Sequence, residues 1–409
     1  MNMKEVLIKE YSNLKKLSIP SKELENTFNH HFIKGAFLEI LGDKHKKFLV
    51  EFINQDSNKI IYSSEITTNM WTKCNIQYYI NWKIKVTDLS TNEVVFEKPY
   101  NAENKRVYIH LDSKALGDTL AWFPYIEEFR KLHKCEVVVS TFHNSWFKSE
   151  YPELEFIEPG TVAHNLYAQY SIGWHYKEDK SVDFDKNPLD FRKLSLQETC
   201  SSILGTTHAE IRPKLAFKKS PPNIEGKYVC IAPHASAHAK YWNYGGGWEG
   251  PTGWQIIIDY LNNKGYKVVM ITLESLGDSW HDSKIGGTLQ GVIDKTGEYS
   301  LEDRANDIMN ADLFIGLGSG LSWLSWALNT PTVLISGFSK PYSEFKDCSR
   351  VFTPSLNICN GCFNTERLDP GDWEWCPKHR DTDRMFECTK TITPDSVIKA
   401  IETQLLNKN

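Results

Sequence analysis

Four cysteines near the end of the chain have the spacing of a metal site. Cys359, Cys362, Cys376 and Cys388 read Cys-x2-Cys-x13-Cys-x11-Cys. A Cys-x2-Cys turn presents two thiolates to one ion, and two further cysteines complete a tetrahedron of sulfur ligands. Four sulfurs suit Zn²⁺ or iron, whereas Mg²⁺ and Ca²⁺ prefer oxygen. Because such a site leaves no coordination position open, we expect a structural metal rather than a catalytic one.

Disulfide bonds or free buried thiols are the alternatives for these four cysteines. A reducing cytosol disfavours disulfides, and the odd total of nine cysteines argues against a fully paired secreted scaffold. The other cysteines are scattered, and most lie in apolar stretches, where a thiol packs as a small hydrophobic group. They are Cys74, Cys135, Cys200, Cys230 and Cys348.

A turn rich in glycine and serine has the composition of a diphosphate-binding site. The stretch GLGSGLSWLSWALNTPTVLISG at 316–337 predicts a strand, a turn and a helix. Amides at the start of a helix lack partners and lie at its positive end, and glycines let a diphosphate approach them. We expect four residues to contact a phosphorylated ligand there, with hydroxyl donors from the serines. They are Ser319, Gly320, Leu321 and Ser322. The alternative is a turn that needs small residues only for packing.

A carboxylate between an early strand and its helix has two possible roles. Asp118, in LGDTLA, is expected in the connecting loop, which should face a ligand cleft. There it could take the proton from an acceptor hydroxyl that attacks a sugar. It could instead cap a helix that begins near Thr119. Asp112 is the reserve candidate for the base.

Two later loops carry further candidate ligand contacts. In PHASAHAKYWNYGGGW, Lys240 could neutralise charge on a departing diphosphate, or it could be a solvated loop lysine. His234 and His238 precede it as possible ligand contacts, although a single histidine is more often structural. In TLESLG, Glu274 could accept a hydrogen bond from a ribose hydroxyl. The tryptophans that could shape the cleft or simply pack are Trp242, Trp248 and Trp254.

Two series of alternating strands and helices must position these residues. The first starts with VYIHLD at residue 107, and the second starts with YVCIAPHAS at residue 228. Apolar runs followed by segments of helical spacing predict parallel sheets with crossover helices. Ser300 is the candidate N-cap of one helix. Before these series, residues 35–100 alternate with period two, which predicts antiparallel β structure, and residues 1 to about 30 have a helical, lysine-rich character.

The predicted fold class is α/β with three domains. We place a β-rich domain at 1–104 and Rossmann-like domains at 105–222 and 223–409, with the cysteine module at 355–392. Two facing Rossmann-like domains bind a ligand in the cleft between them, which is the GT-B architecture of nucleotide-sugar glycosyltransferases. Similar pairs also serve epimerases, binding proteins and dehydrogenases. No Gly-x-Gly-x-x-Gly opens a helix after the first strand and no Walker A motif is present, which disfavours dinucleotide oxidoreductases and P-loop enzymes.

The composition is that of a globular protein that does not bind nucleic acid. The net charge is −5, and the cysteine tail is acidic, so no basic surface is expected. No apolar run reaches the roughly 18 residues of a membrane span. The first residues, MNMKEVLIKEYSN, lack the apolar core of a signal peptide. We therefore expect a cytoplasmic protein.

Several motifs, in order, closely resemble those of the bacterial autotransporter protein O-heptosyltransferases. They are LDSKALGDTLAWFPYIEEF, PHASAHAKYWNYGGGW, GSGLSWLSWAL followed by TPTVLISGF, SKPYSEF and the four-cysteine tail. The resemblance covers nearly the whole chain from about residue 35. It implies a GT-B fold, an ADP-heptose donor, serine acceptors on a secreted adhesin, iron on the four cysteines and a large ring-like homo-oligomer. It also favours Asp118 as general base over the capping role.

The expected function is therefore protein O-glycosylation by a single inverting displacement. Asp118 would deprotonate a Ser or Thr hydroxyl, while Lys240 and the amides at 319–322 hold the departing ADP. One alternative is a GT-B enzyme with another nucleotide-sugar donor or with a glycan or lipid acceptor. Another is a non-catalytic scaffold that has kept the fold.

Overall fold

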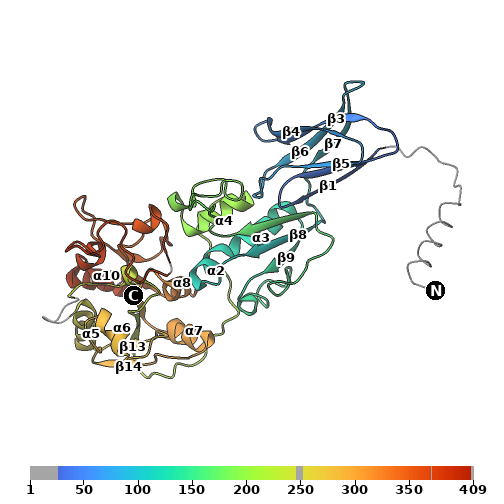
Figure 1. Ribbon diagram of the computed structural model, residues 1–409. Coiled ribbons are helices and arrows are strands. Elements are labelled where there is room, and N and C mark those ends of the chain that lie inside the picture. The colour runs from blue at the N-terminus through green and yellow to red at the C-terminus, as the bar shows by residue number, and fades with distance from the viewer. Residues whose placement is uncertain (1–25, 246–251, 370, 407–409) are drawn as a thin grey trace, which may run out of the picture. The chain divides into compact units, whose positions relative to one another are not determined.

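The computed structural model describes residues 26–245, 252–369 and 371–406 (Figure 1). Within these ranges, no helix combines the length and the apolar character that a membrane span requires. The predicted helical start falls mostly on residues 1–25, which lie outside the described residues. From Thr27 onward that prediction is wrong, because a strand begins there.

In the first of two compact units, residues 26–76 and 80–101 form antiparallel β structure. One sheet has the strand order β1-β2-β5, and a second has the order β4-β3-β6-β7. The strands are β1 Thr27–Ile33, β2 Phe37–Leu41, β3 Lys47–Asn54, β4 Lys59–Thr67, β5 Met70–Lys73, β6 Trp82–Asp88 and β7 Glu93–Pro99. In β6 every second residue is buried, as the period-two pattern of the sequence predicts.

The second unit, Gln77–Tyr79 with Ala102–Asn409, begins with a parallel sheet of order β10-β9-β8-β11. Its strands are β8 Arg106–Leu111, β9 Glu136–Ser140, β10 Glu155–Phe156 and β11 Ala168–Ile172. The helices of this half are α2 Leu116–Trp122, α3 Pro124–His133 and α4 Leu196–Leu204. Ser195 and Glu198 form a capping box that fixes the start of α4.

A second parallel sheet in the same unit has the order β14-β13-β12-β15-β16-β17. Its strands are β12 Tyr228–Ala232, β13 Lys267–Met270, β14 Val292–Asp294, β15 Leu313–Leu317, β16 Thr332–Ile335 and β17 Ser349–Val351. The helices are α5 Gly253–Asn263, α6 Ser279–Lys284, α7 Leu301–Asn310, α8 Gly320–Ala327, α9 Glu387–Lys390 and α10 Pro394–Leu406. The predicted cap is confirmed, since Ser300 Oγ accepts the Asp303 amide at the start of α7.

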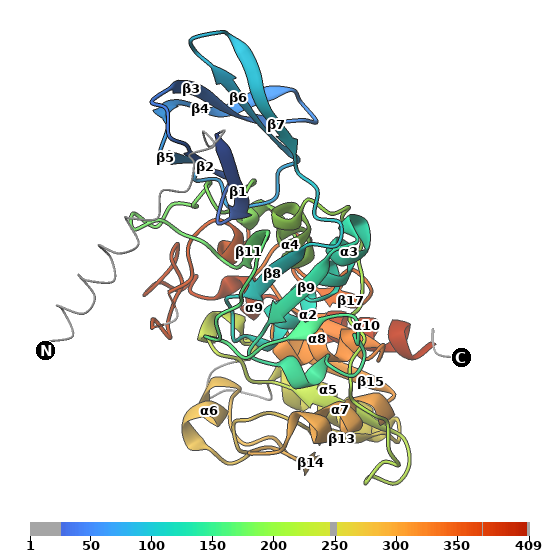
Figure 2. The same cartoon turned by 90° about the vertical axis from the view of Figure 1, so that its right-hand side faces the viewer.

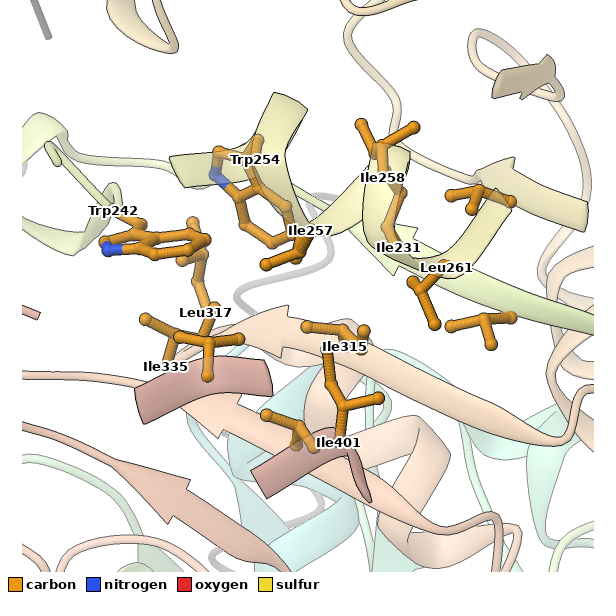
Figure 3. Packing of buried hydrophobic residues seen from close by; sticks show 14 of the residues in the cluster. Ile231, Trp242, Trp254, Ile257, Ile258, Leu261, Ile315, Leu317, Ile335 and Ile401 are labelled. Carbon is orange, nitrogen blue, oxygen red and sulfur yellow. The ribbon is translucent and has the colours of Figure 1, made fainter. Parts of the chain in front are cut away.

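The hydrophobic core of this half lies between the second sheet and helices α5 and α10 (Figure 3). Trp242 and Trp254 pack edge to face in it, with ring centroids 5.5 Å apart. Both are buried, so these two tryptophans pack in the core rather than shape the cleft. Trp248 lies outside the described residues. Successive residues of β15 face opposite sides of the sheet. Gly316 faces α8, and a side chain at this position would collide with Ser322 Oγ, 2.8 Å from where its Cβ would lie.

Helices α2 and α8 lie side by side in both views of the ribbon (Figures 1 and 2), which brings the two halves of the second unit together. A Cβ on Gly117 would lie 2.8 Å from the Trp323 ring, and one on Gly320 would lie 2.8 Å from Leu116 Cβ. Each helix therefore presents a glycine where the other approaches it. This close contact sets the start of both helices beside the same cavity.

Candidate active site and metal module

A cavity of about 500 Å³ lies at the starts of α2 and α8 and beside the 3-10 turn His238–Lys240. Both halves of the second unit and the cysteine module line it. Four of the predicted site residues are in its wall. They are Asp118, Lys240, Ser319 and Gly320. The wall is otherwise largely aromatic and apolar, so charges inside it are poorly screened.

Asp118 lies in the first turn of α2 rather than in the loop before it. The helix starts at Leu116, whereas the sequence predicted a start near Thr119. The N-cap is Ala115, and no side chain caps this helix. The Asp118 carboxylate instead accepts hydrogen bonds from Ser113 Oγ at 2.6 Å and Trp174 Nε1 at 3.1 Å. The capping alternative is therefore wrong, and both donors orient one carboxylate oxygen at the cavity wall.

Asp118 and Lys240 each affect the pKa of the other inside the cavity. Burial raises the pKa of Asp118, while its two hydrogen bonds and the attraction of Lys240 act in the opposite direction. Burial likewise lowers the pKa of Lys240, against the attraction of Asp118 and Glu344. Perturbed groups of opposite charge in one cavity are typical of an active site.

Lys240 is half-buried and closes the turn that follows β12. Its Nζ lies 5.4 Å from the centre of the Phe338 ring. It donates no hydrogen bond to any residue in the described ranges, so its protons are available to a ligand in the cavity. Its place in the cavity wall favours the predicted ligand contact over a solvated loop lysine, and the role of Lys240 stays a prediction.

The glycine-serine turn presents its backbone to the cavity, as predicted, but one of its hydroxyls is engaged. Ser319 is the N-cap residue of α8 and Gly320 is the first helical residue, and both line the cavity. Ser322 is fully buried and its Oγ donates to Leu317 O at 2.6 Å. The Ser322 hydroxyl is thus no ligand donor, which corrects that part of the prediction. Leu321 lies between them and contributes no side chain to the cavity wall.

His234 and Glu274 lie outside the cavity wall. The His234 side chain is only 4% exposed, and neither ring nitrogen has a partner among the described residues. Burial and the neighbouring His281 lower the pKa of His234 to about 4, so the ring is neutral. Glu274 acts on Tyr241, which is a neighbour of His234. Burial is the larger cause that raises the pKa of the Tyr241 hydroxyl, and the Glu274 carboxylate is the second. The centres of the Tyr241 and His234 rings are 5.6 Å apart.

The remaining candidates have structural partners. His238 Nδ1 lies 3.1 Å from the Glu374 carboxylate, so this histidine connects the turn to the cysteine module. Asp112 lies 2.8 Å from His110 Nδ1 and accepts a hydrogen bond from Ser171 Oγ at 2.5 Å. Asp112 is not among the residues that line the cavity, whereas Asp118 is.

Sequence reasoning missed several residues of the cavity wall. Trp174, whose Nε1 donates a hydrogen bond to Asp118, follows β11 and belongs to no motif. Glu344 lies in SKPYSEF, a motif noted only for its resemblance; its carboxylate pairs with Arg350 at 2.5 Å and accepts from Ser339 Oγ. The cysteine module also contributes to the wall, which its spacing did not indicate. Its residues there are Phe363, Asn364, Arg367 and Leu368.

Only part of the predicted four-cysteine set is brought together, since no three of the four sulfurs lie within 4.8 Å of one another. Cys359 Sγ and Cys362 Sγ are 3.5 Å apart, and none of the nine cysteines forms a disulfide bond, so the disulfide alternative is wrong. Burial, together with Cys359 and Cys376, raises the pKa of Cys362 to about 12. Burial and the other three thiols also raise the pKa of Cys388. A soft metal cation bound here would stabilise the ionised form of Cys362 and Cys388.

Two other residues of the module lie beside the first cysteine. Ligand atoms of Cys359, His379 and Glu387 lie within 4.8 Å of one another. Glu387 also accepts the Cys359 amide at 2.7 Å, and Arg384 holds this carboxylate with two hydrogen bonds of 2.6 and 2.8 Å. Sequence spacing gave no signal for either residue. They fit either an alternative ligand set or a support for the cysteine ligands.

Comparison with known proteins gives matches over most of the chain. Residues 190–350 match Glycosyltransferase family 9 (heptosyltransferase). An autotransporter heptosyltransferase of Citrobacter rodentium is 35% identical over 86% of this chain and 83% of its own length. TibC of enterotoxigenic Escherichia coli, an autotransporter heptosyltransferase, is 36% identical over 85% of this chain and 83% of its own length.

Solved structures of TibC share the fold. The structure of this dodecameric, iron-containing heptosyltransferase in complex with ADP-D-beta-D-heptose has a TM-score of 0.82 and 31% identity. It covers 95% of this chain and 100% of TibC. A further relative, BimC of Burkholderia thailandensis, is 28% identical over 76% of this chain and 71% of its own length. BimC is described as an inactive autotransporter heptosyltransferase.

Proposed function

The chain belongs to the autotransporter heptosyltransferases, and on this premise we propose that it transfers heptose from ADP-heptose to Ser or Thr hydroxyls of an autotransporter adhesin. The observation that carries the proposal is a carboxylate and an ammonium, Asp118 and Lys240, in one cavity with the start of α8. The TibC complex with ADP-heptose supports the choice of donor. The names of the relatives support the choice of acceptor.

The proposed architecture is GT-B, with Rossmann-like domains at 105–222 and 223–409 after a β-rich domain at 1–104. Two parallel sheets with crossover helices support this arrangement, as does a cavity lined by both halves. The cysteine module at 355–392 would hold iron on Cys359, Cys362, Cys376 and Cys388, with zinc as the alternative. The description of TibC as iron-containing and dodecameric supports the choice of iron and a homo-oligomer.

The proposed reaction is a single displacement at the anomeric carbon. The acceptor oxygen bonds to that carbon as its proton passes to the Asp118 carboxylate. The bond from the anomeric carbon to the phosphate oxygen breaks on the opposite face, and ADP leaves with the electron pair. Lys240 and the amides of Ser319, Gly320 and Leu321 stabilise the charge that develops on the diphosphate. The product is inverted at the anomeric carbon.

The assignment is tested by incubating the protein with ADP-heptose and an adhesin repeat peptide and weighing the peptide. We expect the mass of one or more heptose residues to be added. If other nucleotide sugars are transferred and ADP-heptose is not, the donor assignment is wrong. A lipid or glycan that is modified when the peptide is not would replace the acceptor.

A non-catalytic role is the second candidate, because a relative is described as inactive. Such a protein would keep the fold without the chemistry. Calorimetry with ADP-heptose separates the two cases when combined with the transfer assay. Donor binding with heptose transfer supports the enzyme, and the absence of both supports a scaffold.

The rate of transfer should depend on pH with a bell-shaped profile. Asp118 acts when ionised, and because burial raises its pKa, the acid limb should lie above the usual range near 3.8. Lys240 acts when protonated, and because burial lowers its pKa, the alkaline limb should begin below 10.5. Initial rates at saturating donor from pH 4 to about 10 would measure both limbs. A profile without an acid limb would exclude Asp118 as the base.

Replacement of one predicted ligand should remove the metal. Cys362→Ser should lose most of the bound iron, because a neutral hydroxyl is a poor ligand in place of a thiolate. Elemental analysis of protein purified without chelator measures the loss. Cys348→Ser, which changes a free cysteine outside the module, should keep the wild-type content. If Cys362→Ser retains iron and His379→Ala loses it, the Cys359, His379 and Glu387 set holds the metal instead.

A further inference from the structure

Asn364 makes hydrogen bonds to both walls of the cavity from one buried side chain. It ends the 3-10 turn Cys362–Asn364, and 8% of it is exposed. Its Oδ1 accepts hydrogen bonds from Lys340 N at 2.8 Å and Ser343 Oγ at 3.0 Å. Its Nδ2 donates to Arg192 O at 2.7 Å. The oxygen of the side-chain amide thus bonds to the segment 340–343, and its nitrogen bonds to Arg192.

The two sets of partners belong to different halves of the second unit. Arg192 precedes α4 in the first half, and residues 340–343 follow β16 in the second half. Two more hydrogen bonds connect the same segments. Arg192 O also accepts from Tyr342 Oη at 3.0 Å, and the Leu196 amide donates to Ser343 O at 2.9 Å. Asn364 therefore lies where both segments meet the cysteine module.

The residue before Asn364 connects the same turn to the general base. The Phe363 ring contacts the Trp174 ring edge to face, with centroids 5.9 Å apart, and Phe191 contacts the same tryptophan at 5.1 Å. Trp174 Nε1 donates to Asp118. Three consecutive residues thus have three roles. Cys362 is a predicted metal ligand, Phe363 contacts the tryptophan that donates to Asp118, and Asn364 forms hydrogen bonds to both walls.

We propose that Asn364 is a positioning residue that couples the metal-binding turn to the acceptor side of the catalytic cavity. A bound metal fixes Cys362, and the short turn then fixes Asn364. Asn364 in turn fixes the Arg192 segment, whose neighbour Phe191 packs on Trp174 beside Asp118. The metal thereby orders the wall around the base without touching the substrate. The kinetic part of this inference rests on the proposed function, and the structural part does not.

Asn364→Asp tests the coupling with almost no change of shape. The aspartate keeps an acceptor for Lys340 N and Ser343 Oγ but has no donor for Arg192 O. We expect hydrogen exchange at the Leu196 amide to become about tenfold faster, since one buried hydrogen bond across the walls is lost. Iron content should equal that of the wild type. In the transfer assay, KM for the acceptor peptide should rise about tenfold while the Kd for ADP-heptose changes less than about twofold.

Asn360→Asp is the matched control in the same loop. Among the described residues, Asn360 Nδ2 donates to Thr353 O and Ile358 O, both within or next to the module. This variant should leave Leu196 exchange and acceptor KM as in the wild type. Equal effects of the two substitutions would mean that any change in this loop disturbs the walls, which would overturn the specific role of Asn364.

Tyr342→Phe provides a second test if Asn364→Asp does not fold. It removes the other donor to Arg192 O and leaves the metal-binding turn unchanged. We expect faster exchange at Leu196 in the same direction, though smaller. Unchanged exchange in whichever variant folds would overturn the proposal. Exchange and iron content are measured without substrate, so a failure of heptose transfer in the wild type would count against the proposed function alone.

Discussion

Asp118→Asn should lower kcat for heptose transfer by about 10²–10⁴-fold, the usual contribution of a general base. Ser113 Oγ and Trp174 Nε1 both donate to one oxygen of Asp118, and the asparagine carbonyl can accept both bonds. The substitution therefore keeps the side chain in place while removing its ability to take a proton. Calorimetry should give a Kd for ADP-heptose within about twofold of the wild type, because the loss falls on the chemical step.

Asp112→Asn is the control for this prediction. Asp112 lies in the same segment of the chain, but it pairs with His110 and Ser171 outside the cavity wall. We expect it to retain most of the transfer activity. If Asp118→Asn instead weakens donor binding strongly and keeps kcat, Asp118 is a binding or structural residue, and the base must be sought elsewhere in the cavity.

The strands and helices that position the site could be predicted because each is encoded by a short stretch of the sequence. Apolar runs such as YVCIA and DLFIGLG became parallel strands, and Ser300 caps α7 as its spacing indicates. The start of α2 was placed wrongly for the same reason. Ala115 precedes that helix without a side-chain cap, so the sequence offered Asp118 as the nearest capping residue. The helix begins earlier because its buried face packs on α8.

The rest of the site depends on contacts between distant parts of the chain. Trp174 and Asp118 are 56 positions apart, and Asn364 and Arg192 are 172 positions apart. No periodicity or short motif encodes such pairs. The internal hydrogen bond of Ser322 was also unpredictable, since a hydroxyl at a helix start can donate to a ligand or to the preceding strand. Cysteine spacing indicated a metal, but not that the module would reach the cavity.

Lys240→Met should reduce kcat by about 10²–10³-fold, the loss typical of one electrostatic contact to developing charge. Methionine preserves most of the length of the side chain and its contact with Phe338, but not its positive charge. Lys240→Arg should recover part of the rate because it restores that charge. Steady-state kinetics at saturating donor, with Lys284→Met as a control, would measure the effect. Lys284 lies near Glu374 and outside the cavity wall, so its removal should have little effect on kcat.

The pH profile of Lys240→Met separates an electrostatic role from a structural one. Lys240 attracts the Asp118 carboxylate and so opposes the rise in its pKa. Removal of the charge should raise the pKa of Asp118 further, and because the base acts when ionised, the acid limb should move to higher pH. Lys240→Arg should leave the acid limb near its original position. If Lys240→Met lowers the rate equally at every pH, the two groups do not interact in the working enzyme, and the loss must come from the leaving diphosphate alone.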